Sequence, residues 1–429
     1  MLNKIKIITL GCAKNTVDSE KIAANLKALH LPVQFCDHPQ EAHTLIINTC
    51  GFILDAKQES INTILEAIEL KKKHLIKNIF VTGCLSTRYI NELRKEIPEV
   101  DNYFTVHNFS TIIDKFNKNT AFDYNNHARL ISTPTHYAYL KIAEGCNRKC
   151  SFCAIPSIRG KYQSETIEHL IYEATNLALA GVKELILIAQ DLTYYGKDIY
   201  KKASLGSLIN KLSEIKGIEW IRLHYTYPQF FTQDLIETIA QNPKVCKYID
   251  IPIQHISNNM LRLMQRNTDA SKLKLLLYKL RKQIPDVHIR TTVLVGHPGE
   301  TKKDFDELIK FINEFKFEKL GAFAYSHEEN TYADKHYKDS ISNKIKQQRL
   351  AKVMQVQQEI TSSINSSFIG TYQRVLIDRK ENGYIIGRTQ YDSPEIDNEV
   401  LIKDTNKYHI GRFYNINIID SFEFDLIGE

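Results

Sequence analysis

The sequence predicts an α/β protein in three parts: an N-terminal open parallel sheet with helices, a central partial β/α barrel of six repeats, and a small C-terminal all-β barrel. Short apolar runs alternate with amphipathic stretches over residues 1–125, which is typical of a parallel sheet covered by helices. Six strand–helix repeats follow in residues 136–364. Residues 365–429 alternate apolar and polar side chains between turn signals, which indicates a small β module.

The N-terminal domain is expected to span residues 1–125. Its apolar runs are short enough for strands, and the stretches after the first three runs have apolar residues at helical spacing. A polar stretch over 125–137 separates this domain from the next. The predicted strands are 4–10, 44–49, 78–83 and 102–106, and the predicted helices are 19–30, 57–73 and 88–97.

The central domain is expected to span residues 136–364. Six repeats are too few for a closed eight-stranded barrel, so an open or partial barrel is predicted, with its site in the loops at the carboxyl ends of the strands. A helix over residues 341–366 leads to the C-terminal domain, 365–429. The predicted barrel strands are 138–145, 184–190, 220–225, 248–253, 288–296 and 319–326.

Composition narrows the class of protein. The N-terminal apolar run is short and interrupted by Lys6, and no stretch approaches the roughly 18 apolar residues of a membrane helix. We therefore expect a cytoplasmic protein without membrane contact. In a reducing compartment its eight cysteines are expected to bind metal or take part in catalysis rather than to form disulfides.

Three cysteines lie close together in the segment EGCNRKCSFCAIPSIRG. Cys146, Cys150 and Cys153 have the spacing CxxxCxxC and follow the first predicted barrel strand. One loop can turn three such thiolates toward a common iron–sulfur cube, and three ligands leave one iron open for a substrate. Residues 141–161 contain five basic residues and one acidic residue, which favours ionised thiolates.

Cys12, Cys50 and Cys84 form a second candidate set. Each lies just beyond a predicted N-terminal strand. The carboxyl ends of parallel strands share one edge of a sheet, where ligands usually bind, so these distant residues can meet there. Ordinary packing at strand ends is the alternative. Three cysteines at equivalent positions of successive repeats favour a shared ligand set.

Other interpretations remain open for the loop. A structural zinc site would need a fourth ligand from a distant histidine or from Cys246, and the three loop cysteines could also lie unliganded in a core. The tight grouping favours a cluster. Cys36 and Cys246 fit neither set and are interpreted as ordinary apolar side chains.

Phe152 completes the pattern CxxxCxFC, which resembles the signature loop of the radical S-adenosylmethionine superfamily. The resemblance implies that the open iron binds the amino and carboxylate groups of S-adenosylmethionine. It also implies that one-electron reduction then releases a 5'-deoxyadenosyl radical. A flavodoxin or ferredoxin is the implied electron donor, because such clusters lie toward the low end of iron–sulfur potentials.

The same resemblance implies further contacts to the cofactor. The segment ILIAQDLTYYG is similar to the second-strand segment of the superfamily and nominates Gln190 and Asp191. Polar residues at strand ends are also commonly caps or loop anchors, so that alternative stays open for each one. His297 stands where the pattern usually has an aromatic residue. The later segments YIDIPIQHISNNML and IRTTVLVGHPGE nominate Gln254, His255, Arg290 and Thr292.

The N-terminal cysteines, in LGCAKNTVDSE and NTCGF, resemble those of the methylthiotransferase branch of this superfamily. The resemblance implies a second 4Fe-4S cluster at Cys12, Cys50 and Cys84, again with one iron open to carry sulfur or a methylthio group. One S-adenosylmethionine would methylate that sulfur, and another would generate the radical that removes hydrogen from an unactivated carbon. The sulfur donor is left unspecified, and a monomer is expected.

Two substrate classes occur in this branch: transfer-RNA adenosines, and an aspartate of the small-subunit ribosomal protein S-twelve. The C-terminal domain resembles a TRAM domain, yet residues 365–429 carry 7 Lys and Arg against 11 Asp and Glu, a net charge of −4. RNA binding favours a positive surface, whereas an acidic module suits a basic ribosomal protein. The segments IDIPIQHIS, FAYSHEENT, PEIDNEV and DLIGE also resemble the aspartate-modifying members of the branch. This resemblance, together with the charge, leads us to expect methylthio transfer to the β-carbon of that aspartate. The alternatives are a tRNA adenosine methylthiotransferase and a non-catalytic iron–sulfur or zinc protein that binds ribosomes.

Overall fold

The structure, a computed structural model, describes residues 3–29, 32–117, 124–125 and 127–429. Position 30, at the end of a predicted helix, and position 126, in the predicted linker, lie outside the described residues. The chain forms two compact units. The first consists of residues 1–132, 144–148 and 153–163, and the second consists of residues 133–143, 149–152 and 164–429.

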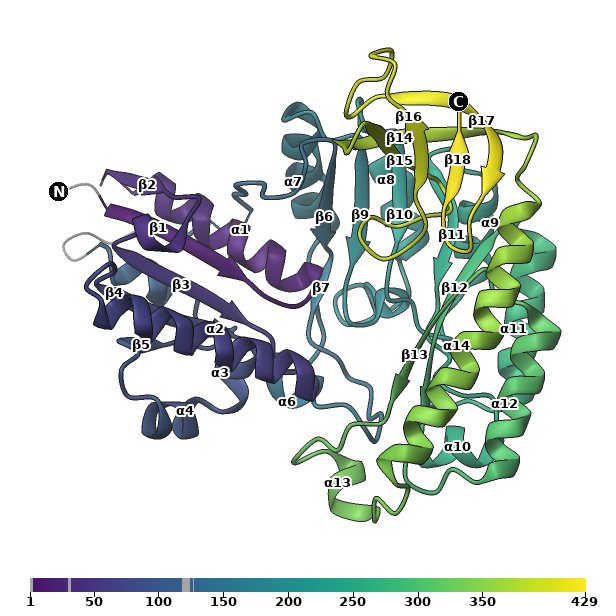
Figure 1. The fold of residues 1–429 in the computed structure, drawn as a ribbon, viewed down its shortest axis with the longest axis horizontal. Coiled ribbons are helices and arrows are strands. Elements are labelled where there is room, and N and C mark those ends of the chain that lie inside the picture. Colours follow the sequence, from purple (N-terminus) through teal and green to yellow (C-terminus); the bar gives the residue numbers. More distant parts are fainter. Residues whose placement is uncertain (1–2, 30–31, 118–123, 126) are drawn as a thin grey trace. The chain divides into compact units, whose positions relative to one another are not determined.

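The first unit is built on a parallel five-stranded sheet in the order β2-β1-β3-β4-β5 (Figure 1). Its central strand β3 (Thr44–Thr49) is buried at every position, as expected for a strand covered on both faces. The strand predicted at 102–106 is shorter in the structure. Strand β2 was not predicted, because a three-residue run gives little periodic signal. The other strands are β1 (Asn3–Thr9), β2 (Val33–Phe35), β4 (Asn78–Gly83) and β5 (Asn102–Tyr103).

Two helices of the first unit differ from the prediction. Helix α1 (Ala13–Ala28) begins well before the predicted start at residue 19. The prediction of one helix over 88–97 is wrong in one respect, because Tyr89 (φ −128°, ψ 31°) divides the segment into two helices. The remaining helices are η1 (Pro39–Glu41), α2 (Leu54–Lys72), α3 (Cys84–Arg88), α4 (Ile90–Glu96), α5 (Ser110–Asp114) and α6 (Ile155–Arg159).

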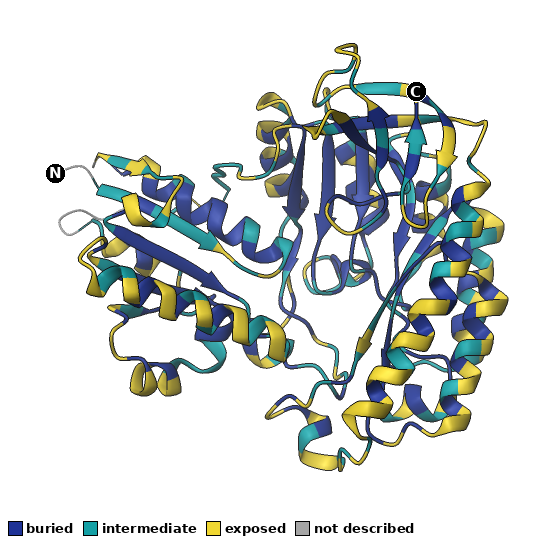
Figure 2. Ribbon diagram, in the orientation of Figure 1, coloured by how far each residue is buried: buried dark blue, intermediate teal, exposed yellow. Residues whose placement is uncertain are grey.

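The second unit contains an open parallel sheet of six strands in the order β6-β9-β10-β11-β12-β13, so the predicted partial barrel is confirmed. Figure 2 shows that β9, β10 and β11 are largely buried, whereas β13 is partly exposed. Consecutive repeats are neighbours in the sheet, as expected for a barrel that does not close. The strands are β6 (Tyr137–Lys141), β9 (Glu184–Ile188), β10 (Trp220–Leu223), β11 (Val245–Asp250), β12 (His288–Val295) and β13 (Lys319–Ala324).

Helices follow the barrel strands, and α14 (Asn343–Ser366) confirms the helix predicted over 341–366. Thr301 and Asp304 form a capping box that begins α12, the hydrogen-bonded arrangement that favours helix initiation. None of the helices in the described ranges is long and apolar enough to cross a lipid bilayer. The other elements are β7 (Ala143–Glu144), β8 (Gln163–Ser164), α7 (Ile167–Leu179), η2 (Leu192–Tyr194), α8 (Leu205–Ser213), α9 (Gln233–Gln241), α10 (Asn258–Leu263), α11 (Ala270–Gln283), α12 (Lys302–Phe315) and α13 (Tyr332–His336).

The C-terminal part of the second unit is a closed five-stranded barrel, which confirms the predicted small all-β module. Its core is aliphatic and includes Val375, Ile385 and Ile416, all buried. Closure leaves no exposed sheet edge. The strands are β14 (Tyr372–Glu381), β15 (Tyr384–Thr389), β16 (Val400–Lys403), β17 (Phe413–Ser421) and β18 (Leu426–Gly428).

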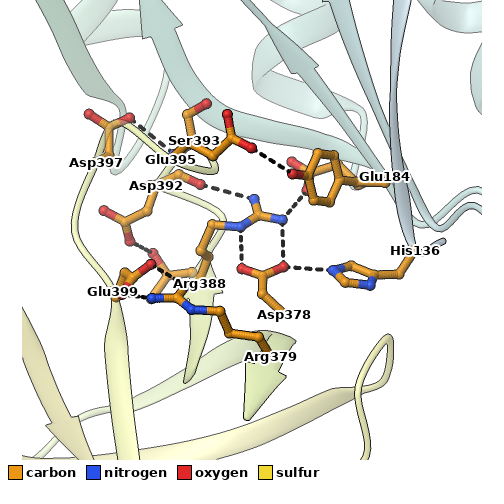
Figure 3. Close-up of polar contacts among 12 residues, drawn as sticks. His136, Glu184, Asp378, Arg379, Arg388, Asp392, Ser393, Glu395, Asp397 and Glu399 are labelled. Carbon is orange, nitrogen blue, oxygen red and sulfur yellow. Dashed lines mark hydrogen bonds and ion pairs between the residues drawn. The ribbon is translucent and has the colours of Figure 1, made fainter. Parts of the chain in front are cut away.

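A buried ion-pair network joins this barrel to the central strands (Figure 3). Glu184, the first residue of β9, accepts hydrogen bonds from Arg388 Nη2 at 2.8 Å and from Arg222 Nε at 2.7 Å. Arg388 Nε also donates to Asp378 at 2.6 Å, and the other Asp378 oxygen lies 2.7 Å from His136 Nε2. Buried charges are tolerated when they are paired in this way.

Two more central strands meet the C-terminal barrel with their first residue. Trp220 of β10 packs edge-on against Phe413, with 4.8 Å between ring centroids. Lys319 of β13 pairs with Asp392 at 2.7 Å. The C-terminal barrel therefore covers the amino ends of the central strands. The loops that form sites in such barrels lie at the opposite, carboxyl ends of the strands.

Candidate metal and cofactor site

Three cysteine-bearing turns converge at the carboxyl edge of the first sheet. Cys12 is the N-cap of α1, Cys50 follows β3, and Cys84 is the first residue of α3. A Cβ at Gly11 would lie 2.9 Å from the Cys50 Sγ, so the first two turns touch. The Cys84 Sγ lies 3.9 Å from the Oδ1 of Asn15 in α1. The structure thus brings the three predicted N-terminal cysteines to one place.

A buried arginine lies beside these thiols. Arg159, the last residue of α6, is 2% exposed and donates its Nη2 to Asn15 Oδ1 at 2.6 Å. Its Nη1 pairs with Asp18 at 3.2 Å and with Glu144 at 3.0 Å. Burial lowers the pKa of Arg159, but Glu144 and Asp18 raise it well above its ordinary value. The guanidinium is therefore a fixed positive charge.

The electrostatic surroundings of the three thiols are uneven. Burial raises the pKa of the Cys12 thiol, but Lys14 and Arg159 bring it below its ordinary value. Burial raises the pKa of Cys50, and it raises that of Cys84 to about 11. Metal binding therefore has to displace protons from Cys50 and Cys84 at neutral pH.

The donor set fits an iron–sulfur cube. Thiolates are the usual ligands of such clusters, and three of them leave one iron open. No three His, Cys, Asp or Glu side chains in the described part of the chain lie close enough to share a single metal ion. A cube holds its protein ligands further apart, because each thiolate binds a different iron.

Gly11 allows this fit to be tested. Its φ is +89°, and an added Cβ would lie 2.7 Å from the Cys50 Cβ. We expect Gly11→Ala to displace Cys50 and to lower the iron content of the reconstituted protein from about eight to about four per chain. The matched control is Gly181→Ala, where φ is +104° but nothing lies within 4 Å of the new Cβ. That variant carries only backbone strain of about 1–2 kcal/mol, so equal iron contents would contradict the crowding of Cys50.

The cysteines of the loop belong to both units. Cys146 and Cys153 belong to the first and Cys150 to the second. The Cys146 Sγ accepts a hydrogen bond from the backbone N–H of Arg148 at 3.4 Å, and the Cys150 Sγ accepts one from Arg266 Nη1 at 3.3 Å. Hydrogen bonds to sulfur are among the features that set the potential of a cluster.

Arg266 and Arg159 are two residues near the cysteines that sequence analysis missed. Arg266 is 4% exposed, its guanidinium lies 4.2 Å from the centroid of the Tyr227 ring, and its Nη2 donates to the Pro252 carbonyl at 2.5 Å. It is 116 positions from Cys150 in the sequence. Arg159 was counted only among the basic residues of the loop. No local pattern could single out either residue, because their partners are distant in the sequence.

Phe152 and His297 are neighbours in the second unit. Phe152 packs against an apolar cluster that includes Met260 and Leu294, and its ring is edge-on to His297 with 6.4 Å between centroids. His297 Nε2 lies 3.0 Å from the Ser151 Oγ. Burial lowers the pKa of His297 to about 4, so its ring is neutral near pH 7. His297 therefore occupies the position of the usual aromatic residue as an uncharged ring.

Two nominated residues make local anchoring contacts. Asp191 is the N-cap of η2 and accepts a hydrogen bond from Thr193 Oγ1 at 2.9 Å. The Nδ1 of His255 accepts from the two following backbone N–H groups at 2.9 and 3.0 Å, and its Nε2 lies 3.3 Å from Glu300. These are the cap and anchor contacts that the alternative interpretation described.

Three other nominated residues lie in or beyond strands of the central sheet, and Thr292 is inside β12. The Gln254 backbone N–H donates to the Thr292 carbonyl at 2.8 Å, which places the two residues side by side. Gln254 has a φ of +68°, a conformation that is uncommon for a residue other than glycine and that clusters at functional sites. Gln190 lies shortly after β9.

Arg290 has a different environment. Its guanidinium lies 3.3 Å from Asp250 and 3.4 Å from Asp397, which belongs to the C-terminal barrel. Asp397 also accepts a hydrogen bond from the Tyr248 hydroxyl at 2.8 Å. These contacts make Arg290 part of the packing between the central sheet and the C-terminal barrel, and its role as a cofactor contact stays a prediction.

Family models and a solved structure match this architecture. The Radical SAM superfamily matches residues 140–312, the Uncharacterized protein family UPF0004 matches 4–105, and the TRAM domain matches 369–429. The radical S-adenosylmethionine methyltransferase TsrM from Kitasatospora setae, with cobalamin and a 4Fe-4S cluster bound, is similar in fold with a TM-score of 0.55. The two share 11% identity over 96% of this chain and 84% of TsrM. The fold and the cysteine loop define a radical S-adenosylmethionine enzyme.

Relatives match the chain from end to end. The ribosomal protein uS12 methylthiotransferase RimO of Parabacteroides distasonis is 48% identical over 427 residues, covering 100% of this chain and 99% of the relative. RimO of Flavobacterium psychrophilum is 51% identical over 431 residues, covering 100% and 98%. The chain belongs to the RimO family. It is a methylthiotransferase that works with two 4Fe-4S clusters and S-adenosylmethionine.

Proposed function

We propose that this enzyme adds a methylthio group to the β-carbon of an aspartate in ribosomal protein uS12. The observation that carries the proposal is the convergence of Cys12, Cys50 and Cys84 at one sheet edge. Methylthio transfer needs a place to hold sulfur in addition to a radical-generating loop, and this second thiol set supplies it. The end-to-end similarity to proteins named for the activity supports the same substrate.

The proposal divides the chain into three functional parts. Residues 1–125 hold one cluster, residues 136–364 form the radical barrel, and residues 365–429 form the TRAM-like module. When bound, the clusters and S-adenosylmethionine supply radical formation by reduction and an open iron for sulfur. The ligands are Cys12, Cys50 and Cys84 for the first cluster and Cys146, Cys150 and Cys153 for the second. The proposed contacts to S-adenosylmethionine are Phe152, Gln190, Asp191, Gln254, His255, Arg290 and Thr292.

The chain's own side chains position these groups and exclude water. Arg266 directs an N–H to the Cys150 thiol and is fixed in turn by the Pro252 carbonyl. Asp191 and His255 are buried at 1% and 0% exposure, and a buried site protects a reactive radical from solvent. The neutral ring of His297 adds an apolar wall behind Phe152 without bringing a charge near the loop.

The C-terminal barrel is the proposed contact surface for a basic protein. Asp378, Asp392 and Asp397 are paired inside the second unit and contribute little to the outer surface. The segment 419–425 is different: it combines the acids Asp420, Glu423 and Asp425 with large apolar side chains that are 45–59% exposed. Opposite charge on a partner mainly speeds encounter and selects the partner. The exposed apolar side chains are Ile419, Phe422 and Phe424.

The proposal extends to the working conditions of the enzyme. A flavodoxin or ferredoxin supplies low-potential electrons, since the clusters of this class require a strong reductant. Modification of a ribosomal protein places the enzyme in the cytoplasm. The proposal takes the chain to act as a monomer.

The test is the mass of uS12 from cells with and without the gene for this chain. We expect uS12 from the deletion strain to lack the mass of one methylthio group, and plasmid-borne wild-type enzyme to restore it. Unchanged modification in the deletion strain would contradict the proposal. Loss of a hypermodified tRNA adenosine in its place would assign the enzyme to the tRNA class. A protein that forms no 5'-deoxyadenosine from S-adenosylmethionine after reduction would be the non-catalytic alternative.

A further inference from the structure

Arg159 connects two cysteine-bearing segments within the first unit. Its side chain pairs with Asp18 of α1, whose N-cap is Cys12, and with Glu144, which lies just before Cys146. The residue after it, Gly160, accepts a hydrogen bond from the Cys146 backbone N–H at 3.1 Å. One residue and its neighbour therefore contact chain segments of both predicted ligand sets.

The helix that carries Arg159 also packs against the third N-terminal cysteine. Ala154 and Ile158 form a small apolar cluster with Cys84, and all three are buried. The guanidinium accordingly lies among the turns of the N-terminal set, with Asn15 as a further acceptor at 2.6 Å.

The first unit contains another buried arginine for comparison. Arg129 donates its Nε to Glu20 at 2.9 Å, and the side chains are 3% and 1% exposed. This pair ties α1 to the segment that follows the sheet. Arg159 differs from it because its positive charge lies beside cysteines.

We propose that Arg159 is a positioning residue for the N-terminal cluster, holding the Cys12 and Cys84 turns and placing a fixed positive charge beside the bound iron and sulfur. The inference rests on the proposed assignment of Cys12, Cys50 and Cys84 as ligands. Reduction adds a negative charge to a cluster, and a nearby positive charge favours the reduced form. Arg159 therefore raises the potential of this cluster, where sulfur is held.

The experiment measures the midpoint potential of the N-terminal cluster alone. The reference is the full-length chain with Cys146, Cys150 and Cys153 replaced by alanine, reconstituted anaerobically and titrated while its EPR signal is followed. In this background we expect Arg159→Gln to shift the potential to more negative values. Asp18→Asn, which removes a buried negative charge from the same group, is expected to shift it to more positive values. Arg159→Lys keeps the positive charge but loses the planar guanidinium that bonds to several acceptors at once. We therefore expect a smaller shift in potential than in Arg159→Gln, with less bound iron than in the reference protein.

The matched control is Arg129→Gln, which breaks a buried ion pair away from the cysteines and is expected to leave the potential unchanged. If Arg159→Gln binds no cluster, the Asp18→Asn variant alone tests the inference. A shift of its midpoint potential to more positive values supports the inference, and a shift to more negative values overturns it. Unchanged potentials in Arg159→Gln and Asp18→Asn would overturn the inference, even if the iron content fell, and would leave Arg159 a structural role only. A reference protein without a four-iron cluster would instead overturn the ligand assignment, and the inference with it.

Discussion

Alanine at Cys146, Cys150 and Cys153 together is expected to lower the iron content of the reconstituted protein from about eight to about four per chain. The same variant is expected to release no 5'-deoxyadenosine from S-adenosylmethionine. Both effects follow if the loop alone holds the cluster that binds this cofactor. Anaerobic iron and sulfide analysis measures the first effect, and chromatography of the reaction mixture after chemical reduction measures the second.

Alanine at Cys12, Cys50 and Cys84 is expected to separate the two activities. This variant should also retain about four irons and should still release 5'-deoxyadenosine, but it should transfer no methylthio group to uS12. Cys36→Ala is the control, because the Cys36 thiol lies near the Glu41 carbonyl at 3.8 Å and belongs to neither set. Loss of all iron in either triple variant would show that the two sets do not hold independent clusters.

Arg388→Ala is expected to destabilise the contact between the C-terminal barrel and the central sheet by about 3–5 kcal/mol. The substitution leaves Glu184 and Asp378 buried without the guanidinium that pairs with both. The sequence has one tryptophan, Trp220, and its ring packs against Phe413 of the C-terminal barrel. Its fluorescence in metal-free protein during urea unfolding therefore reports on this contact.

Two comparisons sharpen that measurement. Lys302→Ala removes an ion pair with Asp306 on a side chain that is 86% exposed, and it should cost less than about 1 kcal/mol. The second comparison is between the unfolding of the wild type and of Arg388→Ala at different pH values. Burial raises the pKa of Glu184 and Asp378, but Arg388 and the other partners bring both below their ordinary values of 4.5 and 3.8.

The sign of the pH dependence follows from these shifts. Because the folded-state pKa values are lowered, the stabilisation is complete above the ordinary values and is lost as pH falls through the folded ones. In Arg388→Ala, Glu184 keeps Arg222 and Asp378 keeps His136, but both carboxylates lose their shared guanidinium and are protonated more readily, so acid should weaken that contact less than in the wild type. An identical loss of stability in acid for both proteins would contradict the role of the network.

The strands of this fold could be predicted because their signals are local. The run at 44–49 has an apolar centre and is buried throughout, and the six barrel strands are likewise short segments with apolar centres. The start of α1 could not be predicted in the same way. Asn15 and Asp18 are buried in its first turns and bond to Arg159, so a polar sequence forms the covered face of the helix.

The convergence of the N-terminal cysteines could be predicted, because it depends only on each cysteine following a strand of one parallel sheet. Cysteines just beyond β3 and β4 must share the sheet edge with Cys12, which follows β1, because parallel strands end on the same side. The partners of Arg159 lie up to 144 positions away, and those of Arg388 up to 204. Such pairs form only after the chain has folded, and no spacing rule within the sequence contains them.

The first unit is assembled from three separate stretches of chain, and this has a consequence for how such enzymes evolve. A gene fragment that ended at residue 132 would lack Glu144 and Arg159 and would leave Cys84 without the helix that covers it. The N-terminal sheet is therefore not a self-contained cassette. Recombination that transplanted it onto another barrel would have to carry the neighbouring loop as well, so the two thiol sets are expected to be inherited together.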